Sequence, residues 1–270
     1  DLHINNWNKF NDYYKRTLNS IRVLFLIKDL CKKYKCPALF CGDLLHKPEN
    51  IDSDLFGILV DKFNELFDGT WKMLSINGNH DLNKVNNVDN PVGGWLNKFA
   101  KIYPDIVCID CDSYSIDNNY QVFGIPYIDH NIGINQYIKN LKLSDDKENI
   151  LLLHTDYPGA KDTDNTEVNS VENLNINILS RFDLVLCGHI HKPQRLSKKV
   201  YMVGAPNQQR RTDKDCELGY CEIYSDLSVK FIPFTDFPKF IDVDDDSKII
   251  DDGNYYTVVK TKNEVEISKN

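Results

Sequence analysis

Long apolar runs are absent from this sequence. Its apolar segments, such as residues 150–153, are far shorter than the roughly 20 residues that a membrane-spanning helix needs. No signal peptide is visible at the start either, where Asp1 looks like a cut point rather than a natural beginning. We therefore expect no membrane segment, and a chain of 270 residues that buries one sizeable core with the start of a second small domain.

A disulfide framework is absent as well, although the sequence holds eight cysteines. Such frameworks belong mainly to small secreted domains. Cys41 and Cys187 each end an apolar run, where a reduced thiol packs as a small hydrophobe. Cys108 and Cys111 form one isolated pair, without the second pair that a zinc site would need. This usage predicts a reducing compartment: the cytoplasm, or alternatively the nucleus, or the host cytoplasm if the protein is viral.

The third missing feature is a broad basic stripe. Asp and Glu outnumber Lys and Arg by 40 to 32, giving a net charge of −8, the opposite of what a free-standing nucleic-acid binder carries. Part of the excess is local, because residues 242–252 contain six aspartates and one lysine. We interpret that run as a solvated linker. The chain then divides into a main domain at 1–235 and a segment at 236–270, formed by the acidic linker and the possible start of a capping domain.

Apolar periodicity predicts an α/β protein. The expected helices cover residues 12–35, 54–67, 95–102 and 171–180, with Ser53 as the N-cap of the second. The expected strands cover residues 37–41, 71–76, two or three segments within 106–126, then 149–153, 183–187, 200–203, 220–224 and 229–232, the last three forming a meander. Strands that alternate with helices and are then followed by strands alone indicate a layered core with a mixed sheet.

Residues that commonly bind metals are concentrated where the predicted strands end. The set contains two carboxylates, one amide and four imidazoles: Asp1, His3, Asp43, Asn79, His154, His189 and His191. Carboxyl ends of strands are where open α/β sheets bind ligands. Seven ligands exceed the needs of one ion but suit two ions that share a carboxylate. Mixed oxygen and imidazole ligands favour manganese, iron or zinc over calcium or magnesium, and we expect two Mn²⁺, with Fe²⁺ or Zn²⁺ as alternatives.

Each of these motifs has an ordinary structural explanation when it is taken alone. Gly42-Asp43 is a common turn, and a lone strand-end histidine such as His154 is more often structural than a ligand. Gly78-Asn79-His80-Asp81 is more specific, because a glycine, two ligands and an acid rarely follow a buried strand together. Five of the seven histidines lie in these clusters, which separate structural explanations do not account for.

Together, five motifs resemble the calcineurin-like metallophosphoesterase superfamily over residues 1–191: Asp1-x-His3, Gly42-Asp43, Gly78-Asn79-His80-Asp81, His154 and Gly188-His189-x-His191. The resemblance implies a layered α/β/β/α fold with mixed central sheets. It implies that one ion is held by Asp1, His3, Asp43 and His191, and the other by Asp43, Asn79, His154 and His189, so that Asp43 bridges the two. It also implies catalytic roles for His80 and Asp81: His80, steadied by Asp81, stabilises the transition state or protonates the departing oxygen.

Members of this superfamily have a buried strand directly before the first aspartate, whereas this sequence begins at that aspartate. We therefore expect the first strand to be missing and Asp1 to be poorly anchored. A second departure concerns the Ser/Thr phosphatase branch, which continues as Gly-Asp-x-x-Asp-Arg-Gly. Here the run is Gly42-Asp43-Leu44-Leu45-His46-Lys47-Pro48, without the arginine that grips phosphate, which argues against that branch.

Three segments instead resemble the SbcD-type DNA repair nucleases, the partners of an SMC-like ATPase: residues 42–48, 123–127 and 201–208. This resemblance implies a dinuclear-metal phosphodiesterase, a DNA exo/endonuclease of repair or recombination. Its expected partners are DNA and the ATPase, with a homodimer also open, and residues 255–260 would begin a capping domain. The alternatives are a small-molecule (cyclic nucleotide) phosphodiesterase and a non-catalytic scaffold on the same fold. A scaffold would have no need of His80 beside a complete ligand set.

Overall fold

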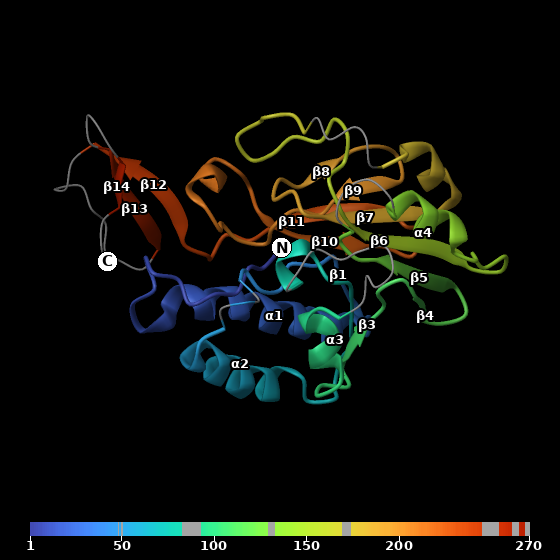
Figure 1. The fold of residues 1–270 in the computed structure, drawn as a ribbon, viewed down its shortest axis with the longest axis horizontal. Helices are drawn as coiled ribbons and strands as arrows, with labels where there is room; N and C mark the ends of the chain where they lie inside the picture. Colours follow the sequence, from blue (N-terminus) through green and yellow to red (C-terminus); the bar gives the residue numbers. More distant parts are fainter. Residues whose placement is uncertain are drawn as a thin grey trace.

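The computed structural model describes residues 1–47, 49, 51–82, 93–128, 133–168, 174–244, 254–260 and 265–267. Two sheets lie face to face with helices on their outer sides, which is the layered α/β/β/α arrangement expected from the sequence (Figure 1). Within the described ranges, no helix combines the length and the apolar composition that a membrane span requires.

The first sheet contains three parallel strands in the order β1-β2-β3: β1 (Ala38–Phe40), β2 (Met73–Ser75) and β3 (Ile106–Cys108). The second contains six strands in the order β4-β5-β6-β7-β9-β8: β4 (Ser113–Ser115), β5 (Tyr120–Ile125), β6 (Glu148–His154), β7 (Leu184–Gly188), β8 (Gln194–Arg195) and β9 (Val200–Met202). Its four central strands run parallel, while β4 and β8 pair antiparallel at the edges, so this sheet is mixed.

The expected meander is wrong in one respect. Strand β9 does not continue into β10 (Gly219–Ile223) and β11 (Val229–Pro233) but pairs with β7 inside the six-stranded sheet. Strands β10 and β11 form a hairpin of their own. A third, small sheet has the order β12-β13-β14, from β12 (Lys239–Val243), β13 (Tyr255–Lys260) and β14 (Val265–Ile267), and lies at one end of the molecule (Figure 1). The domain boundary near residue 235 stays a prediction, and most of the acidic run lies outside the described residues.

The helices are α1 (Lys15–Tyr34), α2 (Ser53–Leu66), α3 (Trp95–Ala100) and α4 (Ile134–Asn140), with short 3-10 turns η1 (Asp12–Tyr14), η2 (Asn79–Asp81), η3 (Ile176–Arg181) and η4 (Arg211–Asp213). The N-cap of α2 is Asp52 rather than Ser53, because the Asp52 carboxylate accepts a hydrogen bond from Leu55 N. In place of the helix expected at 171–180, the structure has the 3-10 turn η3. Residues 171–173 of the expected helix lie outside the described ranges.

Three apolar cores separate the layers. Helices α1, α2 and α3 pack on the outer face of the first sheet, where Leu24, Phe63 and Met73 are buried. Along β6, side chains alternate between the two faces of the sheet, as a strand requires. Ile150 and Leu152 lie in the core between the sheets, whereas Leu151 and Leu153 lie in the outer core with α4 and η3. Strand β1 runs parallel to β2, and β6 runs parallel to β7, so the predicted ligands that follow these strands lie at carboxyl ends.

Candidate dinuclear metal centre

The segment that carries Asp1 and His3 is held against the loop after β1. The backbone N–H groups of Leu2 and His3 both donate to Asp43 O, at 2.8 and 3.0 Å. The Asp1 carboxylate is buried and accepts from the backbone N–H of His189, at 3.0 and 3.2 Å for its two oxygens. The expectation that Asp1 would be poorly anchored is therefore wrong, because its carboxylate is held by the His189 loop and the residues after it by Asp43 O.

Two glycines let the ligand loops approach one another closely. Gly42 has a φ of +97°, and a Cβ there would lie 2.6 Å from His154 Nδ1. A Cβ on Gly78 would lie 2.1 Å from Asp43 Oδ1. Neither position tolerates a larger side chain without displacing a predicted ligand, which explains why glycine precedes a ligand in both motifs.

The seven predicted ligands meet in two groups that share Asp43. In the first group, His3 Nε2 lies 3.1 Å from His191 Nε2 and 3.6 Å from Asp43 Oδ2, and Asp1 lies beside His3 and Asp43. In the second group, Asn79 Oδ1 lies 3.0 Å from both His154 Nε2 and His189 Nδ1. Asp43 Oδ2 also lies 3.3 Å from His154 Nε2, so one oxygen faces both groups, as a bridging ligand would.

The spacing and the protonation states of these side chains fit two divalent cations. Two nitrogens that bind one ion at about 2.1 Å, at a near-tetrahedral angle, lie roughly 3.4 Å apart, close to the separations found here. Burial lowers the pKa of His3 and of His154 below that of an exposed histidine. Burial alone would raise the pKa of Asp43, but the neighbouring histidines, His154 foremost, hold it well below its usual range. Neutral imidazoles and an ionised carboxylate are the forms that bind metal.

The outer nitrogens of three of these histidines have acceptor partners that sequence reasoning did not identify. His154 Nδ1 lies 2.6 Å from Cys41 O, and His189 Nε2 lies 3.3 Å from Asp156 Oδ1. His191 Nδ1 lies 3.3 Å from Asp213 Oδ2. Carbonyl and carboxylate oxygens only accept, so each contact places the proton on the outer nitrogen and leaves the inner lone pair free. Only Asp156 had a signal in the sequence, because it follows His154 by two residues.

His80 lies outside the two groups defined above, although its ring forms a third cluster with His3 and His46. Its backbone N–H donates to Asp43 Oδ1 at 2.8 Å, and its ring Nδ1 lies 2.7 Å from His46 O. The ring stacks on that of His46, with centroids 5.1 Å apart and planes 11° apart. His46 in turn lies 4.8 Å from the Trp7 ring. In the sequence His46 belongs to the run 42–48 that resembles the nuclease branch, but no motif there marks it as a site residue.

The interpretation of Asp81 as support for the His80 ring needs correction. The carboxylate of Asp81 is buried and accepts from the backbone N–H groups of Asp43 at 2.8 Å, Leu45 at 3.0 Å and Gly78 at 3.0 Å. Burial and the neighbouring Asp43 charge raise the pKa of Asp81 to about 7, against the effect of the N–H donors. Asp81 therefore ties together the two loops that carry Asp43 and Asn79, while His46 O supports the His80 ring.

Comparisons with known proteins identify the family to which this chain is similar. Residues 1–193 match the family model described as calcineurin-like phosphoesterase. Among solved structures, the crystal structure of TT1561 of Thermus thermophilus is 16% identical and aligns with a TM-score of 0.50 over 80% of this chain and 94% of its own, which concerns the fold alone. A second solved structure is 14% identical over 69% of this chain and 86% of its own, with a TM-score of 0.44.

A search of curated proteins found no significant match. The family model, however, covers most of the chain and every predicted ligand. Families of this type depend on a dinuclear metal centre, and the side-chain groups described above offer the ligands for one. The chain therefore belongs to the calcineurin-like phosphoesterase family and is a metal-dependent phosphoester hydrolase.

Proposed function

We propose that this chain is a DNA nuclease: a two-metal phosphodiesterase of repair or recombination that an SMC-like ATPase brings to its substrate. The observation that carries the proposal is the position of His46. This residue belongs to the run Gly42-Asp43-Leu44-Leu45-His46-Lys47-Pro48, which resembles the SbcD-type branch and lacks the arginine of the Ser/Thr phosphatases. The His46 ring stacks on the His80 ring, and the His46 carbonyl oxygen lies 2.7 Å from His80 Nδ1. These contacts support the proposal that the run 42–48 helps to position His80.

The other two nuclease-like segments also reach the predicted ligands. Tyr127, at the end of the segment 123–127, places its ring 5.8 Å from that of His189. Within the segment 201–208, the backbone N–H of Ala205 donates to His191 O at 2.9 Å. Each segment that resembles the nuclease branch thus contributes a contact to the metal centre, which supports reading the resemblance as functional.

In this proposal, Asp1, His3, Asp43 and His191 hold one cation, and Asp43, Asn79, His154 and His189 hold the other. Manganese is the metal we expect, with iron or zinc as alternatives. Two divalent cations supply a nucleophile at neutral pH and neutralise the charge that develops on the phosphate. The contact of His80 Nδ1 with His46 O leaves the Nε2 atom of His80 for the substrate, where it stabilises the transition state or protonates the departing oxygen.

The surface charge explains why a partner would be needed. Arg210 is paired with Asp162 at 2.6 Å, and both Arg211 and Lys214 are paired with Asp242. These basic side chains already have acidic partners, and the net charge of the sequence is −8. Because phosphate contacts supply most of the affinity for nucleic acid, we expect the chain alone to bind duplex DNA weakly.

The test is hydrolysis of labelled DNA, single- and double-stranded, beside cyclic nucleotides, all with manganese. We expect slow DNA cleavage by the chain alone and faster cleavage with the ATPase partner, with products that carry a 5′ phosphate if His80 faces the 3′ oxygen. The control is Asp43→Ala, because it removes the shared ligand and should abolish every activity of this centre. Rapid cyclic-nucleotide hydrolysis beside inert DNA would contradict the nuclease proposal and favour a small-molecule phosphodiesterase.

A further inference from the structure

We propose that Asp213 is a positioning residue of the metal centre, which fixes His191 in the tautomer and orientation that turn Nε2 toward the first cation. The inference rests on the ligand assignment made above and is independent of the DNA substrate. Asp213 lies in η4, far from every motif that the sequence pointed to. It is fully buried, although an aspartate in that position would be expected to stay exposed unless its carboxylate is well satisfied.

The carboxylate of Asp213 contacts hydrogen-bond donors on three segments of the chain. Oδ2 faces His191 Nδ1 at 3.3 Å and accepts from the backbone N–H groups of Gln209 at 2.9 Å and Arg210 at 3.1 Å. Oδ1 accepts from Thr163 Oγ1 at 2.9 Å and from Arg210 Nε at 3.3 Å. With all of these bonds directed at its two oxygens, the carboxylate has little freedom to turn away from His191.

This arrangement decides which nitrogen of His191 is protonated. An ionised carboxylate can only accept, so the contact with Asp213 requires a proton on Nδ1. The lone pair is then on Nε2, which lies 3.1 Å from His3 Nε2, on the side of the predicted cation. Without Asp213, the proton could move to Nε2 or the ring could turn, and either change would remove the ligand.

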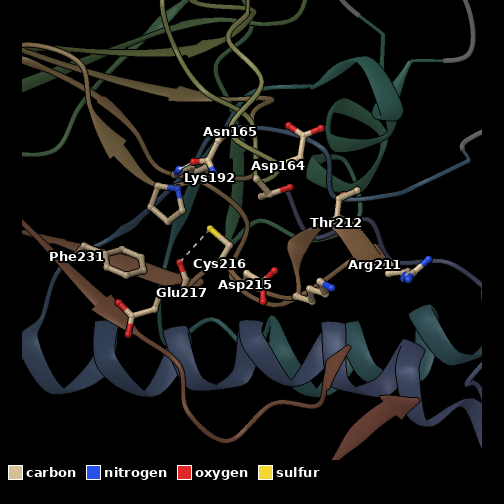
Figure 2. A pocket seen from close by; sticks show the side chains of 12 residues that line it. Asp164, Asn165, Lys192, Arg211, Thr212, Asp215, Cys216, Glu217 and Phe231 are labelled. Atoms are coloured by element: carbon tan, nitrogen blue, oxygen red, sulfur yellow. Dashed lines mark hydrogen bonds between the residues drawn. The ribbon is translucent and has the colours of Figure 1, made fainter. Parts of the chain in front are cut away.

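Packing alone does not hold the loop that carries Asp213. A cavity of about 750 Å³ lies against this loop, and its lining includes Thr163, Lys192 and Arg211. Figure 2 shows polar and charged side chains around this cavity, among them Asn165, Lys192, Thr212 and Asp215. On this side the loop faces the cavity, and its restraints include the hydrogen bonds to the Asp213 carboxylate and the ion pairs of Arg211 and Lys214 with Asp242.

Asp156 provides the natural comparison. It faces His189 Nε2 at the same distance of 3.3 Å, but its side chain is 38% exposed, whereas that of Asp213 is 0% exposed. Water can replace an exposed acceptor, but it reaches a buried one poorly. Loss of the Asp213 carboxylate should therefore affect its histidine more than loss of the Asp156 carboxylate affects His189.

The experiment compares the wild-type chain with Asp213→Ala, Asp213→Asn, Asp156→Ala, Thr163→Val and His191→Ala. Thr163→Val is the matched control, because it removes a bond to Oδ1 and weakens the loop without touching the contact with His191. Manganese binding is measured by calorimetry. We expect Asp213→Ala to lower the affinity for one of the two manganese ions by about 10–100-fold, the usual effect of losing the hydrogen-bond partner of a metal ligand. Asp213→Asn, which keeps an acceptor but not the charge, should fall between Asp213→Ala and the wild type. Asp156→Ala should lose less affinity than Asp213→Ala, and Thr163→Val should stay near the wild type.

The second readout is the tautomer of His191 in the metal-free wild-type protein, measured by long-range ¹H–¹⁵N NMR and assigned by comparison with His191→Ala. We expect a proton on Nδ1. A proton on Nε2 would overturn the inference even if Asp213→Ala failed to fold. The inference would also be overturned if Asp213→Ala bound manganese as tightly as the wild type. An equal loss of affinity in Thr163→Val would overturn it too, because Asp213 would then only support the loop. If His191→Ala binds both ions normally, the ligand assignment itself fails, and this inference with it.

Discussion

The two halves of the metal centre are built in different ways. The half around Asn79, His154 and His189 lies at the carboxyl ends of parallel strands, and His154 is fixed by a backbone carbonyl, Cys41 O. The half around His3 and His191 depends on an irregular loop, because the outer nitrogen of His191 faces the side chain of Asp213. His189 in the first half also has a side-chain partner, but that carboxylate, on Asp156, is partly exposed, whereas that of Asp213 is buried. Substitutions behind the ligands should therefore affect the second half more than the first.

The largest effect should come from the residue that serves both halves. Asp43 Oδ2 lies 3.6 Å from His3 Nε2 and 3.3 Å from His154 Nε2. We expect Asp43→Ala to lose both manganese ions and all phosphoesterase activity, because this carboxylate faces the ligands of both groups. Elemental analysis after manganese loading and gel filtration measures the stoichiometry, which should approach two in the wild type. Retention of one tightly bound ion by Asp43→Ala would show that the halves bind independently of this carboxylate.

A smaller effect is expected from the residue that belongs to neither half. His80→Ala should keep both ions, since the contact between Asp43 and residue 80 uses the backbone N–H, which alanine retains. Turnover should fall by roughly 10²–10⁴-fold, the usual loss when a general acid is removed. The comparison variant is His46→Ala, which removes the stacked ring but keeps the carbonyl at His80 Nδ1. If His80→Ala binds less metal than Asp43→Ala, the roles of these two residues are reversed.

The same contrast between the halves explains what could be predicted from the sequence. Strands such as β6 were recognisable because Ile150, Leu151, Leu152 and Leu153 form a continuous buried run, and the ligand His154 directly ends it. The layered fold follows from such runs and is confirmed. The structure also brings all seven predicted ligands together, although their binding of metal stays a prediction.

Other features had no local pattern to reveal them. Asp213 faces His191 only because the loop around residues 207–213 folds back through bonds between polar side chains and the backbone. The pairing of β9 with β7, rather than with the hairpin that follows, is likewise a long-range choice between strands of similar composition. Asp81 was misassigned because it neighbours His80 in sequence, whereas its carboxylate is directed at the backbone of the neighbouring loop.

The smallest predicted effect concerns Asp110, a buried residue beside the half of the centre that contains Asn79, His154 and His189. Its carboxylate accepts from Asn77 N at 2.9 Å and from Asn77 Nδ2 at 2.5 Å, directly before the loop that carries Asn79. Burial raises the pKa of Asp110 to about 6, in spite of these hydrogen bonds. The folded protein therefore holds this proton more tightly than the unfolded chain does, so the stabilising contribution is complete at low pH and is lost as the pH rises through about 6.

Asp110→Asn removes this titration, and the comparison with wild type isolates it from the other groups. Between pH 5 and pH 8, the free energy of unfolding of the wild type should fall relative to that of Asp110→Asn by roughly 1.4 kcal/mol, because the pKa of Asp110 in the folded protein lies about one unit above pH 5. Urea unfolding of the metal-free proteins at the two pH values measures the difference, and any constant cost of the substitution cancels. A parallel pH dependence in the two proteins would show that Asp110 is ionised throughout this range. Asn77 would then donate its hydrogen bonds to a charged carboxylate, and these charge-assisted bonds would hold the loop that carries Asn79.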